Sequence, residues 1–240
     1  MVLNIIGIGL GDEKDITLKG LELIKKSDLI YLESYTSKLN CDISKLEKLY
    51  KKRIILADRT LIENKEDIIN NAKTKNVSLL IIGDVFGATT HIDIMTRAKE
   101  KNIKTTITHN ASILTAVGET GLELYKFGKT TSIPFENQNI ISPIKVLKDN
   151  QNLGLHTLFL LDLRPDEKKF MSIQESINYL LKNKVKDQKA IACCGLGSEK
   201  QIIKSDKLTK LKNKKFNVYP QCLIIPGKLH FMEEEFLESL

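Results

Sequence analysis

The chain has 240 residues, a formal net charge of +7 and 42% hydrophobic residues, enough apolar content to build a sizeable core. No stretch reaches the roughly 18 to 20 apolar residues of a membrane-spanning helix, and the first ten residues lack the basic segment of a signal peptide. We therefore expect a soluble, cytoplasmic protein that does not contact a membrane. The basic charge permits an acidic or RNA-associated partner. No RNA-binding signature and no Trp are present, however, so we expect no direct nucleic-acid binding.

Neither the lysine-rich run nor the four cysteines indicate a functional site. The run from Lys210 to Lys215 is typical of a solvated face or loop. The four cysteines fit neither a disulfide framework nor a zinc site, because the adjacent pair Cys193-Cys194 has neither ligand spacing nor a nearby histidine. We expect reduced, mostly buried cysteines and no metal site.

The first half of the chain alternates apolar, strand-like runs with helix-period segments, which predicts an α/β fold with a mainly parallel sheet. One helix has a chemical start signal, since Ser44 and Glu47 have the spacing of a capping box. The predicted strands are 3–8, 29–32, 53–57, 77–82 and 104–108, and the predicted helices are 18–26, 45–51, 66–73 and 92–101.

A second series of elements begins after Asn110, and we place a boundary there between an N-terminal α/β lobe, 1–110, and a C-terminal α/β lobe, 111–240. Ser172 and Glu175 repeat the capping-box spacing. We expect the two α/β lobes to pack closely, with a ligand cleft between them. The predicted strands are 131–134, 157–163, 190–194 and 221–225, and the predicted helices are 144–148 and one beginning at Ser172.

Two glycine-containing loops follow predicted strands of the first half. In Gly7-Ile8-Gly9-Leu10-Gly11-Asp12, glycines let the backbone turn sharply and approach a ligand. Asp12 stands where a dinucleotide-binding loop has Gly or Ala, and its charge would oppose a pyrophosphate, which disfavours that class. An ordinary strand-to-helix loop remains the alternative.

The second loop, Gly83 to His91, begins at the carboxyl end of the most apolar strand, where ligands bind in open α/β sheets. Asp84 could accept hydrogen bonds from a ligand, or could be a turn or N-cap residue. His91 lacks a second ligand at metal-binding spacing, so we interpret it as structural or facing the substrate. The clusters 109–113, 197–198 and 226–230 are each compatible with loops alone. The motifs of serine hydrolases, P-loop enzymes and zinc proteases are absent.

Taken together, these segments resemble the diphthine synthases of the tetrapyrrole methylase superfamily. The resemblance covers nearly the whole chain in the family's order. Its segments are 7–21, 33–37, 83–84 with 88–91, 109–121, 125–129, 154–157 and 225–230.

This resemblance implies two α/β lobes, a homodimer, and S-adenosylmethionine (SAM) held in the cleft between the lobes. It also implies successive methylation of the amino group of a 3-amino-3-carboxypropyl chain on a histidine of elongation factor 2, giving diphthine. Archaeal relatives stop at a trimethylated amine, and eukaryotic relatives add a methyl ester. The positions corresponding to the family's SAM contacts are Leu10, Asp84, Gly87, Ser112, Ile113, Leu161, Leu196 and His230.

The resemblance assigns no catalytic base, although His91 and His109 are candidates. A desolvated site favours the neutral amine, so a base is not required. The alternative within the superfamily is a methylase that acts on a tetrapyrrole carbon. An alternative from another class is a non-catalytic adaptor that binds translation factors or RNA through its basic surface.

Overall fold

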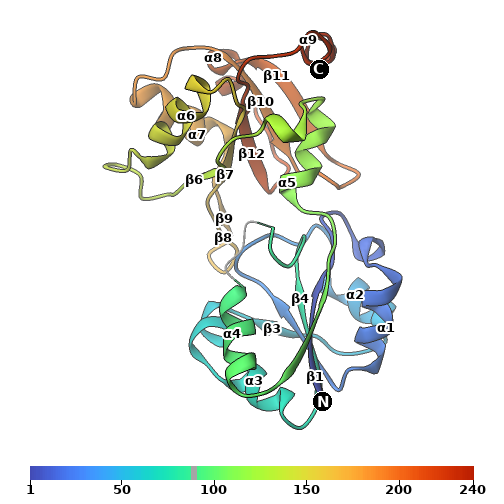
Figure 1. The fold of residues 1–240 in the computed structure, drawn as a ribbon. Helices are drawn as coiled ribbons and strands as arrows, with labels where there is room; N and C mark the ends of the chain where they lie inside the picture. Colours follow the sequence, from blue (N-terminus) through green and yellow to red (C-terminus); the bar gives the residue numbers. More distant parts are fainter. Residues whose placement is uncertain (88–90) are drawn as a thin grey trace. The chain divides into compact units, whose positions relative to one another are not determined.

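The computed structural model describes residues 1–87 and 91–240, in two units, Met1–Leu114 and Thr115–Leu240. The predicted α/β class is confirmed in both (Figure 1). Within the described residues, no helix is long and apolar enough to cross a membrane. The four cysteines are free, and all but Cys41 are buried.

The N-terminal unit is built on a parallel five-stranded sheet with the order β3-β2-β4-β1-β5. Every predicted strand and helix of this half is present, with ends that differ by no more than two residues. The strands are β1 (Val2–Gly7), β2 (Leu29–Glu33), β3 (Ile55–Ala57), β4 (Asn76–Ile81) and β5 (Lys104–Thr108), and the helices are α1 (Leu18–Lys26), α2 (Ile43–Tyr50), α3 (Asp67–Ala72) and α4 (Ile92–Glu100). Short helical turns lie at Glu13–Asp15 (η1) and Thr60–Asn64 (η2).

Helices cover both faces of this sheet, because alternate residues of a strand point to opposite faces (Figure 1). Leu3 and Ile5 of β1 belong to the core shared with α3 and α4. Ile6 of the same strand belongs to the core shared with α1 and α2. The strands are therefore apolar on both sides, as expected for a buried parallel sheet.

The C-terminal unit has a mixed sheet with the order β11-β10-β12-β7-β6, in which only β6 and β7 are parallel neighbours. Its main core packs α6, α7 and α8 against the sheet. The strands are β6 (Thr131–Ile133), β7 (Thr157–Leu161), β10 (Lys189–Cys194), β11 (Ile202–Lys207) and β12 (Gln221–Ile225), with a small hairpin of β8 (Leu163–Arg164) and β9 (Lys169–Phe170). The helices are α5 (Ile113–Ala116), whose first two residues belong to the N-terminal unit, α6 (Ser142–Asn152), α7 (Ile173–Lys182), α8 (Leu208–Lys212) and α9 (Phe231–Glu238), with turns η3 (Val117–Thr120) and η4 (Leu124–Lys126).

The two predicted capping boxes have different outcomes. Ser172 and Glu175 form a complete capping box at the start of α7, as predicted. The box predicted at Ser44 is wrong, because α2 begins at Ile43, so that its N-cap is Asp42 and Ser44 lies inside the helix. The Glu47 carboxylate instead accepts a hydrogen bond of 2.9 Å from the backbone N–H of Ile54.

Candidate functional site

The carboxyl ends of β1 and β4 continue into the two glycine loops, and the loops bond to each other. Gly9 N–H donates to the Gly83 carbonyl at 3.2 Å, and Gly83 N–H donates to the Gly9 carbonyl at 2.8 Å. Gly9 and Gly83 both adopt positive φ, +82° and +86°, which a side chain would strain. The two loops therefore form a fixed pair at one edge of the sheet.

The Asp15 side chain holds the first loop in place through two hydrogen bonds. Its Oδ2 atom accepts hydrogen bonds from the backbone N–H groups of Leu10 at 3.1 Å and Gly11 at 2.7 Å. A Cβ atom on Gly9 would lie 2.4 Å from the Cβ of Asp15, so only glycine fits there. The loop is thus shaped by a carboxylate of this chain.

Asp84 organises the second loop and the end of β5. Its Oδ1 accepts from the Phe86 N–H at 2.9 Å, while its Oδ2 accepts from the Asn110 N–H and from His109 Nδ1, both at 2.9 Å. Burial raises the pKa of Asp84, but these hydrogen bonds outweigh burial and lower the pKa below its usual value. Asp84 is therefore an ionised carboxylate, a group that can accept several hydrogen bonds at once.

Asn110 joins the two glycine loops to the end of β5, a role that its place in the cluster 109–113 did not indicate. Its amide nitrogen donates to the carbonyls of Gly7 at 3.1 Å and Asp15 at 3.0 Å. Its own backbone N–H is the one that Asp84 holds. Any ligand at this edge meets a backbone surface whose shape depends on these bonds.

The structure brings five of the predicted cofactor positions together at this edge. Leu10 lies beside Gly83, where an added Cβ would meet Leu10 Cδ2 at 3.5 Å. Gly87 packs on Ser112 so closely that an added Cβ would lie 2.4 Å from the Ser112 Cβ. Asp84 follows Gly83 in the second loop. Ile113 follows Ser112 as the first residue of α5.

The two histidines of this half have different environments. His91 is 2% exposed, and its burial lowers its pKa despite the opposing effect of the Glu33 carboxylate. His91 is therefore neutral at pH 7. His109 is largely exposed and bonded to Asp84. The described part of the chain contains no group of three His, Cys, Asp or Glu residues that could hold a metal. The family motif at Ala88–Thr90 lies outside the described residues.

In the C-terminal unit, the three remaining predicted positions fall at two ends of the sheet. Leu161 and Leu196, 7% and 6% exposed, both lie near Gln221, where β12 begins. His230 follows the other end of β12 and is exposed. Leu161 and Leu196 therefore belong to the same end of this sheet, and His230 to the other.

His230 begins α9 as its N-cap, in a capping box with Glu233 that the sequence analysis missed. Glu233 is 1% exposed and accepts hydrogen bonds from the backbone N–H groups of Glu123 and His230 and from His156 Nε2, and it also pairs with Lys126. Burial raises the pKa of Glu233, but these donors lower it to about 2.

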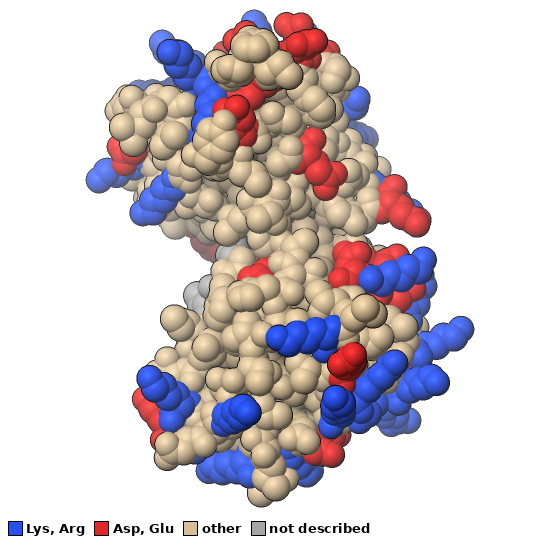
Figure 2. All heavy atoms as spheres, turned by 45° about the vertical axis from the view of Figure 1, so that its right-hand side comes forward, with Lys and Arg blue, Asp and Glu red and all other residues tan. Residues whose placement is uncertain are grey.

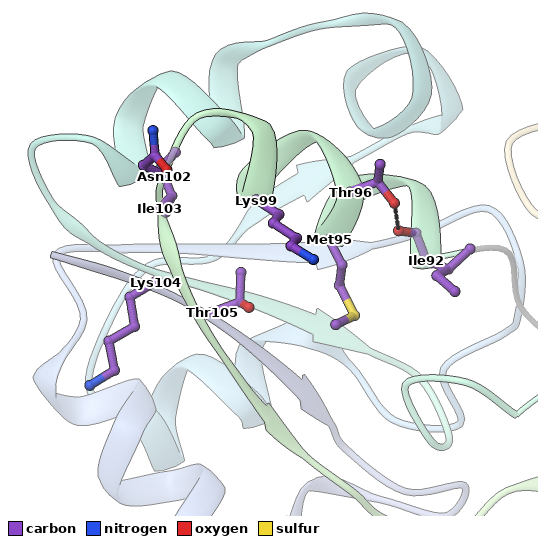
Figure 3. Close-up of a pocket in the computed structure, with 8 residues that line it drawn as sticks. All are labelled: Ile92, Met95, Thr96, Lys99, Asn102, Ile103, Lys104 and Thr105. Atoms are coloured by element: carbon purple, nitrogen blue, oxygen red, sulfur yellow. Dashed lines mark hydrogen bonds between the residues drawn. The ribbon is translucent and has the colours of Figure 1, made fainter.

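Figure 3 shows a separate groove between α4 and the edge strand β5 of the N-terminal unit. None of the predicted cofactor positions lines this groove. Its lining residues are Ile92, Met95, Thr96, Lys99, Asn102, Ile103, Lys104 and Thr105.

Comparison with known proteins decides the family. The family model described as Tetrapyrrole (Corrin/Porphyrin) Methylases matches residues 2–212. A diphthine synthase of Methanocaldococcus jannaschii is 44% identical over 253 residues, covering 100% of this chain and 98% of the relative. This chain belongs to the diphthine synthase family. A diphthine methyl ester synthase of Dictyostelium discoideum is 42% identical over 268 residues, again covering 100% and 98%.

The fold of this diphthine synthase family member agrees with the same assignment. A crystal structure of diphthine synthase superposes with a TM-score of 0.94 at 38% identity, covering 100% of this chain and 95% of that chain. The resemblance stated from the sequence is confirmed, and the chain is a methyltransferase of this family. Neither the tetrapyrrole substrate nor the non-catalytic adaptor is favoured.

Proposed function

We propose that this chain transfers methyl groups from SAM to the amino group of the 3-amino-3-carboxypropyl chain on a histidine of elongation factor 2, giving diphthine. The observation that carries the proposal is full-length similarity, above 40% identity, to relatives named diphthine synthase and diphthine methyl ester synthase. From the resemblance we also propose a cytoplasmic homodimer.

The glycine-loop edge of the N-terminal unit fits SAM chemically. Asp84 is a carboxylate that can accept a hydrogen bond from an amino or hydroxyl group, and the positive φ of Gly9 and Gly83 lets the two loops turn sharply beside it. Leu10, half-buried, and Phe86, 42% exposed, add apolar surface for an aromatic base. We propose Leu10, Asp84, Gly87, Ser112 and Ile113 as cofactor residues on this basis. Leu161, Leu196 and His230 are proposed on the resemblance alone.

Methyl transfer requires mainly that the methyl donor and the acceptor amine are held in the correct geometry. When bound, SAM supplies a methyl group already activated by its sulfonium. Holding two reactants in line can lower a barrier by roughly 7 to 11 kcal/mol. The rigidity of the loops, fixed by Asp15, Asp84 and Asn110, suits this task. The substrate amine must be neutral, and a desolvated site favours that form. The buried, neutral His91 is not needed to remove the proton.

The test is transfer of labelled methyl from SAM to elongation factor 2 that carries the aminocarboxypropyl intermediate. Elongation factor 2 without the intermediate is the matched control, and a porphyrinoid is the competing acceptor. We expect label only on the protein with the intermediate. Label on the porphyrinoid alone would contradict the proposal.

The relatives named for diphthine and for its methyl ester are equally similar to this chain, at 41–44% and 42–43% identity. Mild alkali separates the two products, because it removes methyl esters and leaves methylated amines. The fraction of label released by alkali therefore identifies the ester.

A further inference from the structure

The net charge of the chain is concentrated in two segments of the C-terminal unit. Residues 182–189 contain four Lys and one Asp, and residues 204–215 contain six Lys and one Asp, so together they carry +8. The whole chain carries +7, which leaves −1 for all other residues. We call these ten residues the lysine corner: Lys182, Lys184, Lys186, Lys189, Lys204, Lys207, Lys210, Lys212, Lys214 and Lys215.

The fold places the two segments side by side. Lys189 of β10 lies directly opposite Lys207 of β11 in the antiparallel register. Next to this pair, the Leu208 N–H donates to the Gln188 carbonyl at 3.0 Å. The Asp187 carboxylate accepts from the backbone N–H and the hydroxyl of Thr209, at 3.0 and 2.8 Å. All ten lysines are exposed.

Little within the chain neutralises the lysine corner. Asp206 pairs with Lys210 and Lys214 at 3.5 and 3.6 Å. No other lysine of the corner has a carboxylate side chain within salt-bridge distance in the described part of the chain. Like charges directly opposite in a sheet destabilise the pairing, so Lys189 and Lys207 cost folding energy. A positive surface kept at such a cost is suited to an anionic partner.

The chemistry of the lysine corner favours a protein partner over nucleic acid. Its two segments contain no Arg and no aromatic residue, so they offer neither planar bidentate recognition nor a platform for stacking bases. Lysines on long, flexible stems act as hydrated point charges, which speed the encounter with an oppositely charged surface.

We propose that the lysine corner is the surface that attracts and docks an acidic face of the protein substrate. This inference rests on the proposed function, since it names the region of this methyltransferase that meets elongation factor 2. Electrostatic steering raises the association rate and weakens with salt. The lysine corner should therefore act on kcat/KM and leave kcat unchanged.

The chain offers a matched control. Figure 2 shows Lys and Arg side chains over α1 and α2 of the N-terminal unit as well. There Lys25, Lys26, Lys45 and Lys48 are exposed, and the acidic residues Glu22, Asp28 and Glu47 are close to them in sequence. Changing each of these four to Gln removes the same charge as a corner variant without touching the lysine corner.

The experiment compares three proteins: wild type, the corner variant (Lys186, Lys189, Lys207 and Lys212, each to Gln) and the α1–α2 control. Methyl transfer to elongation factor 2 is measured across a salt series. For the corner variant at low salt we expect kcat/KM to fall by about a factor of ten, with kcat and SAM affinity unchanged and a flatter salt dependence. The control should keep the wild-type salt dependence.

An equal loss in both variants, or no loss in the corner variant, would overturn the inference. So would RNA competing for the lysine corner while kcat/KM for the protein stays at the wild-type value. If wild type transfers no methyl group, the proposed function fails by itself. Titration of elongation factor 2 against wild type and the corner variant then still decides the inference: weaker binding by the variant supports docking, and equal binding overturns it.

Discussion

Gly9 and Gly83, 74 residues apart in the chain, exchange two backbone hydrogen bonds where the loops after β1 and β4 meet. Neither residue belongs to the predicted cofactor set, yet the positions of Leu10 and Asp84 depend on them. Shape at this edge comes from backbone, and side chains such as Asp15 and Asp84 hold that backbone in place.

Replacing Gly9 with Ala should destabilise the protein and weaken SAM binding. The new Cβ would sit 2.4 Å from Asp15 Cβ at a φ of +82°, a conformation that alone costs roughly 1 to 2 kcal/mol. Gly118→Ala is the control, because its nearest neighbour would be a Leu124 methyl at 3.5 Å. Urea unfolding and a SAM titration measure both effects. Equal behaviour of the two variants would contradict the account of the loop.

Asp84→Asn should cost about 1 to 3 kcal/mol of unfolding free energy, because in either orientation the amide nitrogen would face a backbone N–H, that of Asn110 or that of Phe86. SAM affinity should fall with it. Asp12→Asn is the matched control, since Asp12 accepts from the Lys14 N–H, and an amide oxygen can still accept this bond. If Asp84→Asn unfolds at the same urea concentration as Asp12→Asn, Asp84 does not organise the loops.

Glu233 should make the free energy of unfolding decrease at acidic pH. Its pKa is about 2 in the folded chain and near 4.5 when unfolded, so the stabilisation is present above about pH 5 and is lost as pH falls towards 2. The shift corresponds to at most about 3 kcal/mol. Burial also lowers the pKa of His156, whose Nδ1 accepts from the Gly227 N–H. This lowered pKa likewise makes the folded chain less stable as pH falls.

Glu233→Gln should lower stability at pH 7 and flatten the dependence of unfolding free energy on pH between about 5 and 2, as followed by chemical denaturation. Wild type provides the reference slope. An unchanged slope in the variant would show that other carboxylates carry the acid sensitivity.

The two serines with capping-box spacing allow a direct comparison. Ser172→Ala should cost about 1 kcal/mol, because Ser172 caps α7. Ser44→Ala should cost little, since Ser44 lies inside α2 and makes no capping bond. Thermal or urea unfolding of the pair gives the difference, and equal costs would mean that the N-cap bond of α7 contributes nothing.

Sequence reasoning predicted the N-terminal unit well because its strands are continuous apolar runs and its helices have clear periodicity. It missed β11 (Ile202–Lys207), in which only the first two residues are apolar and which is held at the sheet edge by pairing with β10. It also missed α9, where the capping box uses a histidine in place of Ser or Thr. Tertiary pairing and an unusual cap are not visible in a local pattern.

The candidate site was predicted in part for similar reasons. Glycines after apolar strands indicated where Leu10 and Asp84 lie, and the resemblance supplied Gly87 and Ser112. The role of Asn110 depends on contacts with Gly7 and Asp15, about a hundred residues away, so no local spacing could reveal it. Likewise, the run from Lys210 to Lys215 becomes part of a larger basic surface only because β10 places Lys189 opposite Lys207, close in sequence to this run.

The most direct test of the central claim is mass spectrometry of the target histidine peptide. Elongation factor 2 that carries the aminocarboxypropyl intermediate is incubated with this protein and SAM, and with the Asp84→Asn variant in parallel. We predict methyl-sized additions on that peptide alone, fewer with the variant, and their number gives the product. An unmodified peptide despite demonstrated SAM binding would contradict the account, and the acceptor would then have to be another molecule.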